Sequence, residues 1–370
     1  MLINLEKSSL LKAVIIADSV IQGKSINSII DNCLFKVSSD TLEIIATDND
    51  ISIKTVIQCS SDEEGKLTCD GKKLAQILKE LPDGQISIKI SNNLMVLKSV
   101  TLKGDYKLIT TDGDEFPKIE FAKFDFVQIN QSKFKKMIKK VIYAAAHDSV
   151  KPVFNGVYVQ SGKDSTLNMV ASDSRRLSFV SEKIEMIETL VNNSVIPLKT
   201  INEVYKLLDS GMFEFALSEN QCCFNIDKTT IISRLIDGNF PDFEKVIPKD
   251  FIDTLIIDTK SFINSLKRVL IFSKEPTYKT IINISNNTLM LESKTPEFGE
   301  AEEELSIERT SDQDITIGIN GQYLMDSVKE LETLSFKMSI SGTMNPLTIM
   351  PDDTEDSVAV IMPLQIKSAE

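Results

Sequence analysis

Three stretches of the chain open in the same way. Residues 3–14 read INLEKSSLLKAV, residues 127–138 read VQINQSKFKKMI, and residues 256–267 read IIDTKSFINSLK. Each stretch predicts a short strand that runs directly into a helix. Taking Leu10, Phe134 and Phe262 as equivalent positions gives spacings of 124 and 128 residues. A pattern that returns at a nearly constant interval indicates an internal repeat.

A second helix and a short closing motif recur with the same period. The helix reads KLAQILKEL over 73–81, TINEVYKLL over 200–208 and YLMDSVKEL over 323–331. Its apolar residues fall at i, i+3, i+4 and i+7, the pattern of an amphipathic helix. The closing pairs are Phe116-Pro117, Phe240-Pro241 and Met362-Pro363. Because this period is far longer than the ~20–50 residues of solenoid repeats, the copies are whole domains.

Between the helices, the sequence is typical of antiparallel strands. Residues 42–46, 51–54, 85–90 and 94–98 alternate apolar with polar side chains, and Asn92-Asn93 and Asn286-Asn287 indicate hairpin turns. Each copy is therefore predicted to be an α+β domain with two helices packed on antiparallel sheet. We expect the domains to cover residues 1–121, 122–250 and 251–370.

Composition argues against several classes of protein. The chain of 370 residues is 42% hydrophobic and 26% charged, and no apolar run reaches the ~18 residues of a membrane span. The N-terminus lacks the pattern of a signal peptide, so we expect a cytoplasmic protein. The five cysteines contain no CxxC pair and are expected to be small buried hydrophobes, and there is one histidine, His147.

An enzyme is the first alternative considered. The chain has no glycine-rich phosphate loop, zinc motif or nucleophile elbow, so we expect no catalytic residue, metal or cofactor. Asp173 beside Arg175 and Arg176 could be drawn as a site, but a structural ion pair is the favoured interpretation. Nucleotidyl transfer by the purified chain alone would revive the enzyme hypothesis.

The net charge of −13 at first argues against nucleic-acid binding. The repeated helices nevertheless carry lysines, including Lys7, Lys12, Lys139 and Lys140, whereas carboxylates gather in runs such as 300–304 and 352–356. If the helices share one face, their lysines would meet phosphates without reading bases while the acidic runs face away. A protein-binding scaffold that ignores DNA remains the second alternative, and topology-dependent loading on DNA would separate the two.

Three motifs identify a resemblance that runs over essentially the whole chain. They are VASDSRRL over 170–177, LIDGNFPDF over 235–243 and VIMPL over 360–364. Together they resemble the bacterial replicative sliding clamps, the β subunits of DNA polymerase III. The resemblance implies a head-to-tail homodimer whose six domains close into a ring, with the helices lining a hole for double-stranded DNA of any sequence. From the lack of a long apolar run, we expect no membrane partner.

The resemblance also implies three functional surfaces. A groove between the second and third domains would bind short peptides of the polymerase α subunit, the clamp loader, other polymerases and repair proteins. Its matching residues here are Phe154, Ser172, Ser174, Arg175, Arg176, Leu177, Pro241, Lys245, Val246, Val360, Met362, Pro363 and Leu364. The DNA-facing positions would be Lys24, Lys72, Lys73, Lys151 and Lys199. The dimer joint would use Tyr106, Leu108, Ile271 and Phe272, with the run 300–304 opposite Lys73, Lys98 and Lys103.

This chain departs from the family pattern in the groove. Ser174-Arg175 stands where Gly-His is common, Phe154 is bulkier than the usual Leu, and the chain ends in Gln365-Ile366 and a four-residue tail instead of Arg-Leu. Pro152 and Val153 replace an aromatic pair that can contact DNA. The three groove differences bear on the shape and charge of the groove and not on its existence, whereas the difference at Pro152-Val153 predicts that this DNA contact is lost.

Overall fold

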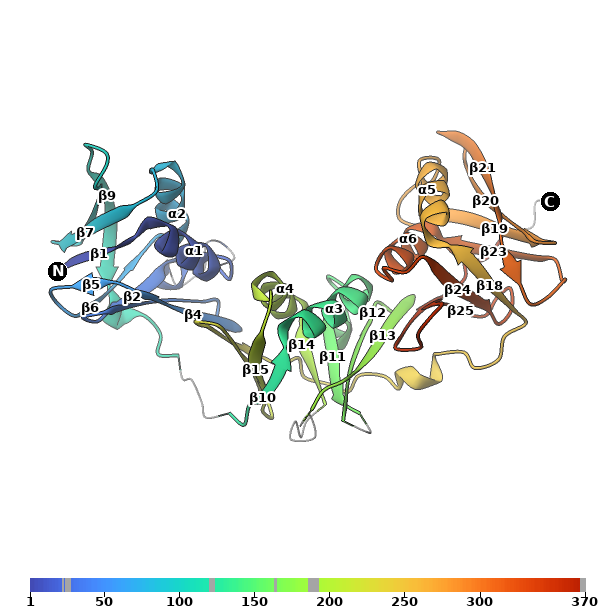
Figure 1. Cartoon of the computed structure of the whole chain (residues 1–370), viewed down its shortest axis with the longest axis horizontal. Coiled ribbons are helices and arrows are strands. Elements are labelled where there is room, and N and C mark those ends of the chain that lie inside the picture. Colours follow the sequence, from blue (N-terminus) through green and yellow to red (C-terminus); the bar gives the residue numbers. More distant parts are fainter. Residues whose placement is uncertain (22, 24–27, 120–123, 163–164, 186–192, 367–370) are drawn as a thin grey trace. The chain divides into compact units, whose positions relative to one another are not determined.

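The computed structural model describes residues 1–21, 23, 28–119, 124–162, 165–185 and 193–366. It contains six α-helices in this described part (Figure 1), two in each copy of the repeat: α1 Lys7–Asp18, α2 Gly71–Glu80, α3 Gln131–Val141, α4 Leu198–Leu207, α5 Thr259–Leu270 and α6 Gly321–Lys329. The chain divides into two compact units, Met1–Gln131 with Asn202–Leu235 and Ser132–Ile201 with Ile236–Glu370.

The anchor residues of the repeat form the centres of the cores. Leu10, Phe134 and Phe262 on the first helix of each copy are all fully buried. The second-helix anchors Leu74, Ile201 and Leu324 are also fully buried. Removing a side chain of this size from water stabilises the folded chain by roughly 1.5–3 kcal/mol. Because the anchor positions are apolar in all three copies, each copy forms its core in the same way.

Local signals fix where the helices and hairpins begin and end. The carboxylate of Asp70 accepts a hydrogen bond from the Lys73 amide (2.9 Å) at the start of α2. The Asn320 side chain does the same for the Gln322 amide (3.0 Å) at the start of α6. Asn92 and Asn93 adopt φ of 51° and 57°, the left-handed conformation that a tight hairpin turn requires. The hairpin turn predicted from this pair is confirmed.

The first unit is organised by a 13-stranded sheet with the order β10-β15-β16-β17-β4-β3-β2-β6-β9-β8-β7-β1-β5. Its strands pair antiparallel, and β17 pairs with β4 so that the second copy continues the sheet of the first. The strands are β1 Leu2–Glu6, β2 Cys33–Val37, β3 Thr41–Thr47, β4 Ile51–Gln58, β5 Ser60–Ser61, β6 Gly65–Cys69, β7 Gln85–Ser91, β8 Leu94–Ser99, β9 Tyr106–Asp112, β10 Val127–Asn130, β15 Met212–Leu217, β16 Gln221–Ile226 and β17 Thr229–Arg234.

The second unit contains two sheets, of nine and four strands. The larger has the order β14-β11-β12-β13-β26-β25-β24-β18-β22, and the smaller has the order β21-β20-β19-β23. The strands are β11 Gly156–Ser161, β12 Thr166–Ser172, β13 Arg176–Lys183, β14 Ser194–Pro197, β18 Asp253–Asp258, β19 Lys279–Ser285, β20 Thr288–Thr295, β21 Gly299–Ser306, β22 Glu308–Arg309, β23 Ile315–Asn320, β24 Ser335–Ile340, β25 Leu347–Pro351 and β26 Ser357–Ile361.

The nine-stranded sheet joins the second and third copies through β13 and β26. These strands pair antiparallel, with Arg176 opposite Ile361 and Leu177 opposite Val360. The predicted α+β class, with paired helices on antiparallel sheet, is confirmed. The division into domains after residues 121 and 250 stays a prediction. Neighbouring copies share sheets, because β17 of the second copy pairs with β4 of the first and β13 of the second copy pairs with β26 of the third.

Candidate functional site

The turn between β12 and β13 is held by its own side chains. The Ser172 hydroxyl donates to the carbonyl of Arg176 (2.7 Å) and accepts from the Ser174 amide (3.1 Å). The Asp173 carboxylate accepts from the amides of Arg175 and Arg176, both at 2.9 Å. Ser174 has a φ of 74°, which allows the chain to reverse within these few residues. The turn therefore presents the backbone and side chains of 174–176 in one fixed arrangement.

Arg176 links this turn to the third copy of the repeat. Its Nε lies 3.1 Å from Asp173 Oδ2, and its Nη1 lies 2.6 Å from Asp326 Oδ2 on α6. The guanidinium also lies over the ring of Tyr323, with Cζ 4.3 Å from the centroid. The side chain is only 12% exposed, so both charge pairs are shielded from water. The predicted structural ion pair between Asp173 and Arg176 is confirmed.

Sequence reasoning missed the partners of Arg176 on α6. Tyr323 and Asp326 are three residues apart, so both side chains lie on one face of the helix. Gln322 supports the arrangement by donating to Asp326 Oδ1 (2.7 Å). A tyrosine and an aspartate at this spacing in the third copy were the available signal, because the first two copies have Lys73-Gln76 and Thr200-Glu203 at these positions.

A hollow of about 40 Å³ lies beside this turn, within the second unit. It is lined by eight of the thirteen residues predicted for the groove: Ser172, Ser174, Arg175, Arg176, Leu177, Val246, Val360 and Met362. Met362 and Val246 are each 42% exposed, so the hollow has apolar surface that is open to solvent. The Met362 amide donates to the carbonyl of Arg175 (2.9 Å), so the end of β26 and the turn are held together at the rim.

Phe154 lies in an aromatic layer beside the hollow. Its ring meets that of Phe240 edge-on at 6.0 Å, and Phe240 stacks on Tyr158 at 4.9 Å. Phe243 in turn stacks on Phe179 at 5.5 Å and packs with Leu177 and Val360. Phe154 is buried, so its bulk supports the wall through this layer instead of lining the hollow.

The remaining predicted groove residues lie at its margins. Pro241 is exposed, and Lys245 forms an exposed ion pair with Asp242 (2.7 Å) that raises the pKa of Lys245. Leu364 donates its amide to the carbonyl of Gly318 (2.8 Å), which ties the terminal segment to β23, and Pro363 precedes it, half-buried. None of these residues lines the 40 Å³ hollow.

Two lysines of α3 are engaged by carboxylates of the third copy. Lys139 pairs with Glu330 (3.3 Å) and with Glu332, and the hydrogen bond from Lys139 holds the pKa of Glu332 below its usual value. Lys140 lies 2.8 Å from Asp356 Oδ2. The expectation that the run 352–356 faces away from the helix lysines is therefore wrong for Asp356, because the β13–β26 pairing carries it to α3.

The lysines predicted to face DNA differ in their surroundings. Lys72 and Lys73 are exposed in the first turn of α2, and Lys151 is exposed with its Nζ 6.0 Å from the centre of the Phe154 ring. Lys199 is half-buried at the start of α4, and Lys24 lies outside the described residues. Lys7, counted among the basic helix residues, is buried and pairs with Asp83 (2.9 Å), so it cannot meet a phosphate.

The residues predicted for a dimer joint lie on the strand β9 and directly after the helix α5. Tyr106 and Leu108 are half-buried on β9, and their neighbour Ile109 is 80% exposed. Ile271, directly after α5, is 70% exposed, and Phe272 beside it is half-buried. Within the chain, Lys98 pairs with Asp105 (3.2 Å).

Several functional classes find no supporting geometry in the described part of the chain. No group of three or more histidine, cysteine or acidic side chains there is arranged to hold a metal ion. None of its helices is both long and apolar enough to pass through a bilayer. All five cysteines are free, and all except Cys59 are buried. Burial raises the pKa of Cys223 to about 12, so its thiol stays protonated.

The three copies of the repeat, taken in order, match one protein family. Three models of the DNA polymerase III beta subunit match the chain in order: the N-terminal domain over residues 1–120, the central domain over 128–242 and the C-terminal domain over 244–365. The chain therefore belongs to the DNA polymerase III beta subunit family.

Curated relatives and solved structures agree with this assignment. The beta sliding clamp of Bacillus subtilis is 25% identical over 376 residues, and that of Streptococcus pneumoniae is 28% identical over 384 residues. Each alignment covers 98% of both chains. The crystal structure of the DNA polymerase III subunit beta from Pseudomonas aeruginosa matches with a TM-score of 0.91 at 26% identity, over 99% of this chain and 100% of that one. The chain is a processivity clamp for DNA polymerase, an accessory subunit and not the catalytic one.

Proposed function

We propose that two copies of this chain close head to tail into a ring around duplex DNA. The ring would hold the replicative polymerase, the clamp loader and other DNA-handling proteins through short peptides bound beside the β12–β13 turn. The chain would contribute no chemistry of its own and would act only by tethering. The observation that carries ring closure is a pair of strand edges, one basic and one acidic, left open by the described strands.

The basic edge belongs to β9. Residues 106–109 pair with β8 on one side, and no described strand pairs with them on the other. Ile109 is exposed there, and the nearby Lys103 and Lys107 are exposed as well. An open edge with an apolar centre and cationic neighbours is suited to pairing with another strand of opposite charge.

The acidic edge belongs to β21. Among the described strands it pairs only with β20, and it presents Glu300, Glu302 and Glu304 to solvent. Ile271 and Phe298 supply exposed apolar surface on the same copy, and Phe298 is 53% exposed. A contact between unlike surfaces closes into a ring only if its rotation returns to the start, which two copies of three domains would satisfy.

The groove would bind apolar peptide anchors. Met362 is flexible and polarisable, and with Val246 and Leu177 it gives an adaptable apolar wall that several partners can share. The fixed turn and the Arg175 side chain would select the polar part of the peptide. The hollow is shallow, so we expect each partner to contribute a modest affinity that other contacts of the assembly reinforce.

Contacts with DNA would come from exposed lysines such as Lys72, Lys73 and Lys151. Lys199 and Lys24 remain part of this proposal. Lysine contacts to phosphates carry no base information and weaken with salt, which suits a protein that must move along DNA.

The test is topological. The purified chain should sediment as a dimer and, once loaded, should stay on nicked circular DNA and leave when the circle is cut. Ile109→Asp should yield monomers that are not retained, because it places a charge in the apolar centre of the joint. Leu334→Asp is the matched control, since Leu334 is 91% exposed but is neither on the two strand edges nor beside one of the lysines proposed to contact DNA. Equal retention on circular and linear DNA would disprove the ring.

A further inference from the structure

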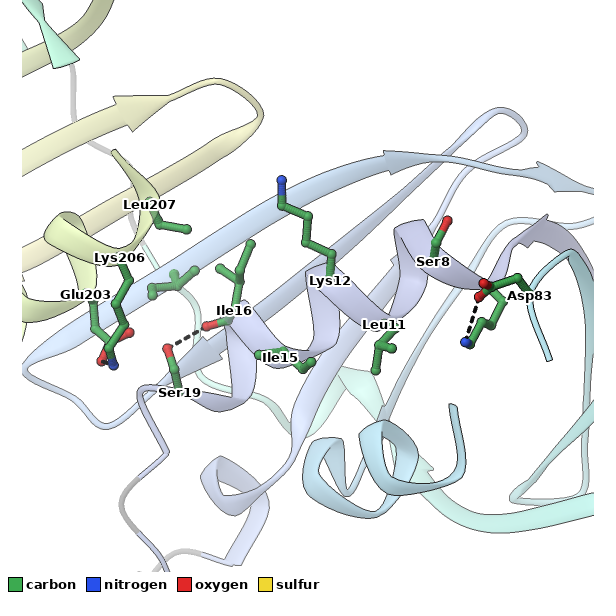
Figure 2. Close-up of a pocket in the computed structure, with 12 residues that line it drawn as sticks. Ser8, Leu11, Lys12, Ile15, Ile16, Ser19, Asp83, Glu203, Lys206 and Leu207 are labelled. Carbon is green, nitrogen blue, oxygen red and sulfur yellow. Dashed lines mark hydrogen bonds and ion pairs between the residues drawn. The ribbon is translucent and has the colours of Figure 1, made fainter. Parts of the chain in front are cut away.

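An apolar groove lies between α1, β4 and the end of α4, entirely within the first unit. Its volume is about 470 Å³, within the range of sites that hold small molecules. Leu11, Ile15 and Ile16 of α1, Ile53 of β4 and Leu207 of α4 form its apolar surface. Figure 2 shows the side chains of α1 and α4 that border it.

Helix α1 is apolar on two faces, and only one of them serves the core. Leu10, Val14 and Ala17 are fully buried under the sheet. Ile15 points the other way into the groove and is 42% exposed, beside Ile16. At the spacing of 124 residues, the equivalents of Ile15 and Ile16 in the second copy are Lys139 and Lys140. The first copy thus presents aliphatic surface where the second presents charge.

The same position in the second unit is almost filled. There Lys140, Tyr143, Ser178 and Leu331 line a space of only about 10 Å³. By the same spacing, Tyr143 corresponds to Ser19, which closes α1 and lines the groove in the first unit. The groove therefore depends on the side chains that line it and not on the repeated backbone.

The charges at the rim leave one lysine without a carboxylate. Asp83 lies at one end and pairs with Lys7 (2.9 Å), and Lys206 pairs with Glu203 (2.7 Å) at the other end (Figure 2). Lys12 is exposed and has no ion pair among the residues that the structure describes. The lining residues carry three lysines and two carboxylates, so the groove has one unbalanced positive charge.

We propose that this groove binds an amphipathic anion, a molecule with one carboxylate and an aliphatic body. The carboxylate pairs with the Lys12 ammonium, and the aliphatic chain covers Ile15, Ile16 and Leu207. An aliphatic body gains by leaving water for this surface, and one charge-assisted contact fixes its direction. The site is separate from the peptide groove and does not depend on ring closure.

The test uses decanoate as the probe, below its micelle-forming concentration, with the intact chain labelled at isoleucine methyl groups. Decanoate should shift the methyl resonances of Ile15, Ile16 and Ile53 saturably and leave that of Ile317, in the core of the other unit, unchanged. Lys12→Gln should weaken binding about tenfold, the effect of one charge-assisted hydrogen bond. Decylamine, with the same body and the opposite charge, should bind more weakly than decanoate.

Two variants taken from the second copy test the shape of the groove. Ser19→Tyr and Ile16→Lys introduce the residues found at Tyr143 and Lys140, and each should abolish the decanoate shifts. Unchanged melting temperatures will show that the variants fold, and Lys12→Gln, at an exposed position, provides an independent test if they do not. Equal binding of decylamine, full binding by Ser19→Tyr, or shifts spread over both units would overturn the proposal.

Discussion

The turn at 47–51 in the first unit and the turn at 172–176 in the second have the same backbone design. The Thr47 hydroxyl donates to the carbonyl of Ile51 (3.0 Å), as the Ser172 hydroxyl does to that of Arg176 (2.7 Å). Asp48 and Asp173 each accept two amides that follow them in the turn. The third residue of both turns is left-handed, with φ of 79° and 74°.

The two turns differ in the side chain that follows. Ile51 is buried in the 13-stranded sheet, whereas Arg176 reaches Asp326 on α6 and lies over Tyr323. By the repeat spacing, the counterpart of Asp326 is Glu203, which pairs with Lys206 on its own helix. The repeat thus reproduces the backbone, and one residue decides whether the turn ends in a core or in a charged link beside a candidate binding site.

Replacing Arg176 with isoleucine, the residue at the equivalent position 51 of the first turn, should have the largest effect on stability. Arg176→Ile leaves the carboxylates of Asp173 and Asp326 without their partner at a shielded position. Removing one member of a buried charge pair costs about 3–5 kcal/mol, and we expect a loss near the lower figure because the Asp326 side chain keeps 27% of its exposure. Urea unfolding followed by far-UV circular dichroism measures this loss.

Arg234→Ile is the matched control for this substitution. Arg234 is 67% exposed in its side chain and lies 3.9 Å from Asp50, so its pair is solvated and should contribute less than about 1 kcal/mol. The assigned role of Arg176 is wrong if the two variants lose the same stability. The peptide groove is tested at the same time, since Arg176→Ile should also weaken partner-peptide binding in a fluorescence anisotropy titration.

The second substitution compares α1 and α3, the first helices of the first and second copies. Lys140→Ile gives α3 the residue that α1 has at Ile16 and removes the partner of Asp356. Although burial raises the pKa of Asp356, the hydrogen bonds from Lys140 and Thr354 outweigh it and hold the pKa below the usual 3.8. A carboxylate whose pKa is lowered by folding stabilises the folded chain at any pH above the pKa that it has in the unfolded chain. This stabilisation disappears as the pH falls through the pKa that it has in the folded chain.

We therefore expect Lys140→Ile to lose about 1 kcal/mol of stability at pH 7, since the pair is partly exposed. The difference from the unaltered chain should shrink as the pH falls below about 4, and it should vanish once the pH has passed the lowered pKa of Asp356 in the folded chain. Stability curves against pH for the two proteins give this measurement. A difference that stays constant down to pH 2 would mean that lost packing, and not the ion pair, is responsible.

The sequence predicts those features that depend on nearby residues. The anchors Leu10, Phe134 and Phe262 and the alternating strands follow from periodicity, because each element must bury one face. The pairing of Asp173 with Arg176 also follows, since the two lie in one turn. The link from Lys140 to Asp356 spans 216 residues and exists only because β13 and β26 pair. Non-local pairing of this kind leaves no periodic signal in the sequence.

The predicted groove residues also divide into those positioned by their neighbours in sequence and those positioned by distant packing. The predicted wall around Ser172–Leu177 is brought together because it is one turn and the strand beside it. Phe154 stays a prediction for the groove: its ring packs edge-on against Phe240, and it is not among the residues that line the 40 Å³ hollow. Which face of an aromatic side chain meets a hollow depends on the packing of several distant strands, and spacing alone does not determine it.

The smallest effect should come from the left-handed residue of each turn. A left-handed conformation costs an L-residue roughly 1–2 kcal/mol, but asparagine tolerates it better than serine because its side chain bonds locally. Ser174→Gly should therefore stabilise the chain by about 0.5 kcal/mol, after allowing for the greater freedom of glycine in the unfolded chain. Asn49→Gly should change stability less, although its φ is nearly the same. The midpoints of urea unfolding, measured for both variants under the same conditions, show which substitution stabilises the chain more. A larger gain at Asn49 than at Ser174 would show that the hydrogen bonds of the two turns, and not the conformational preference of the residue, set the cost.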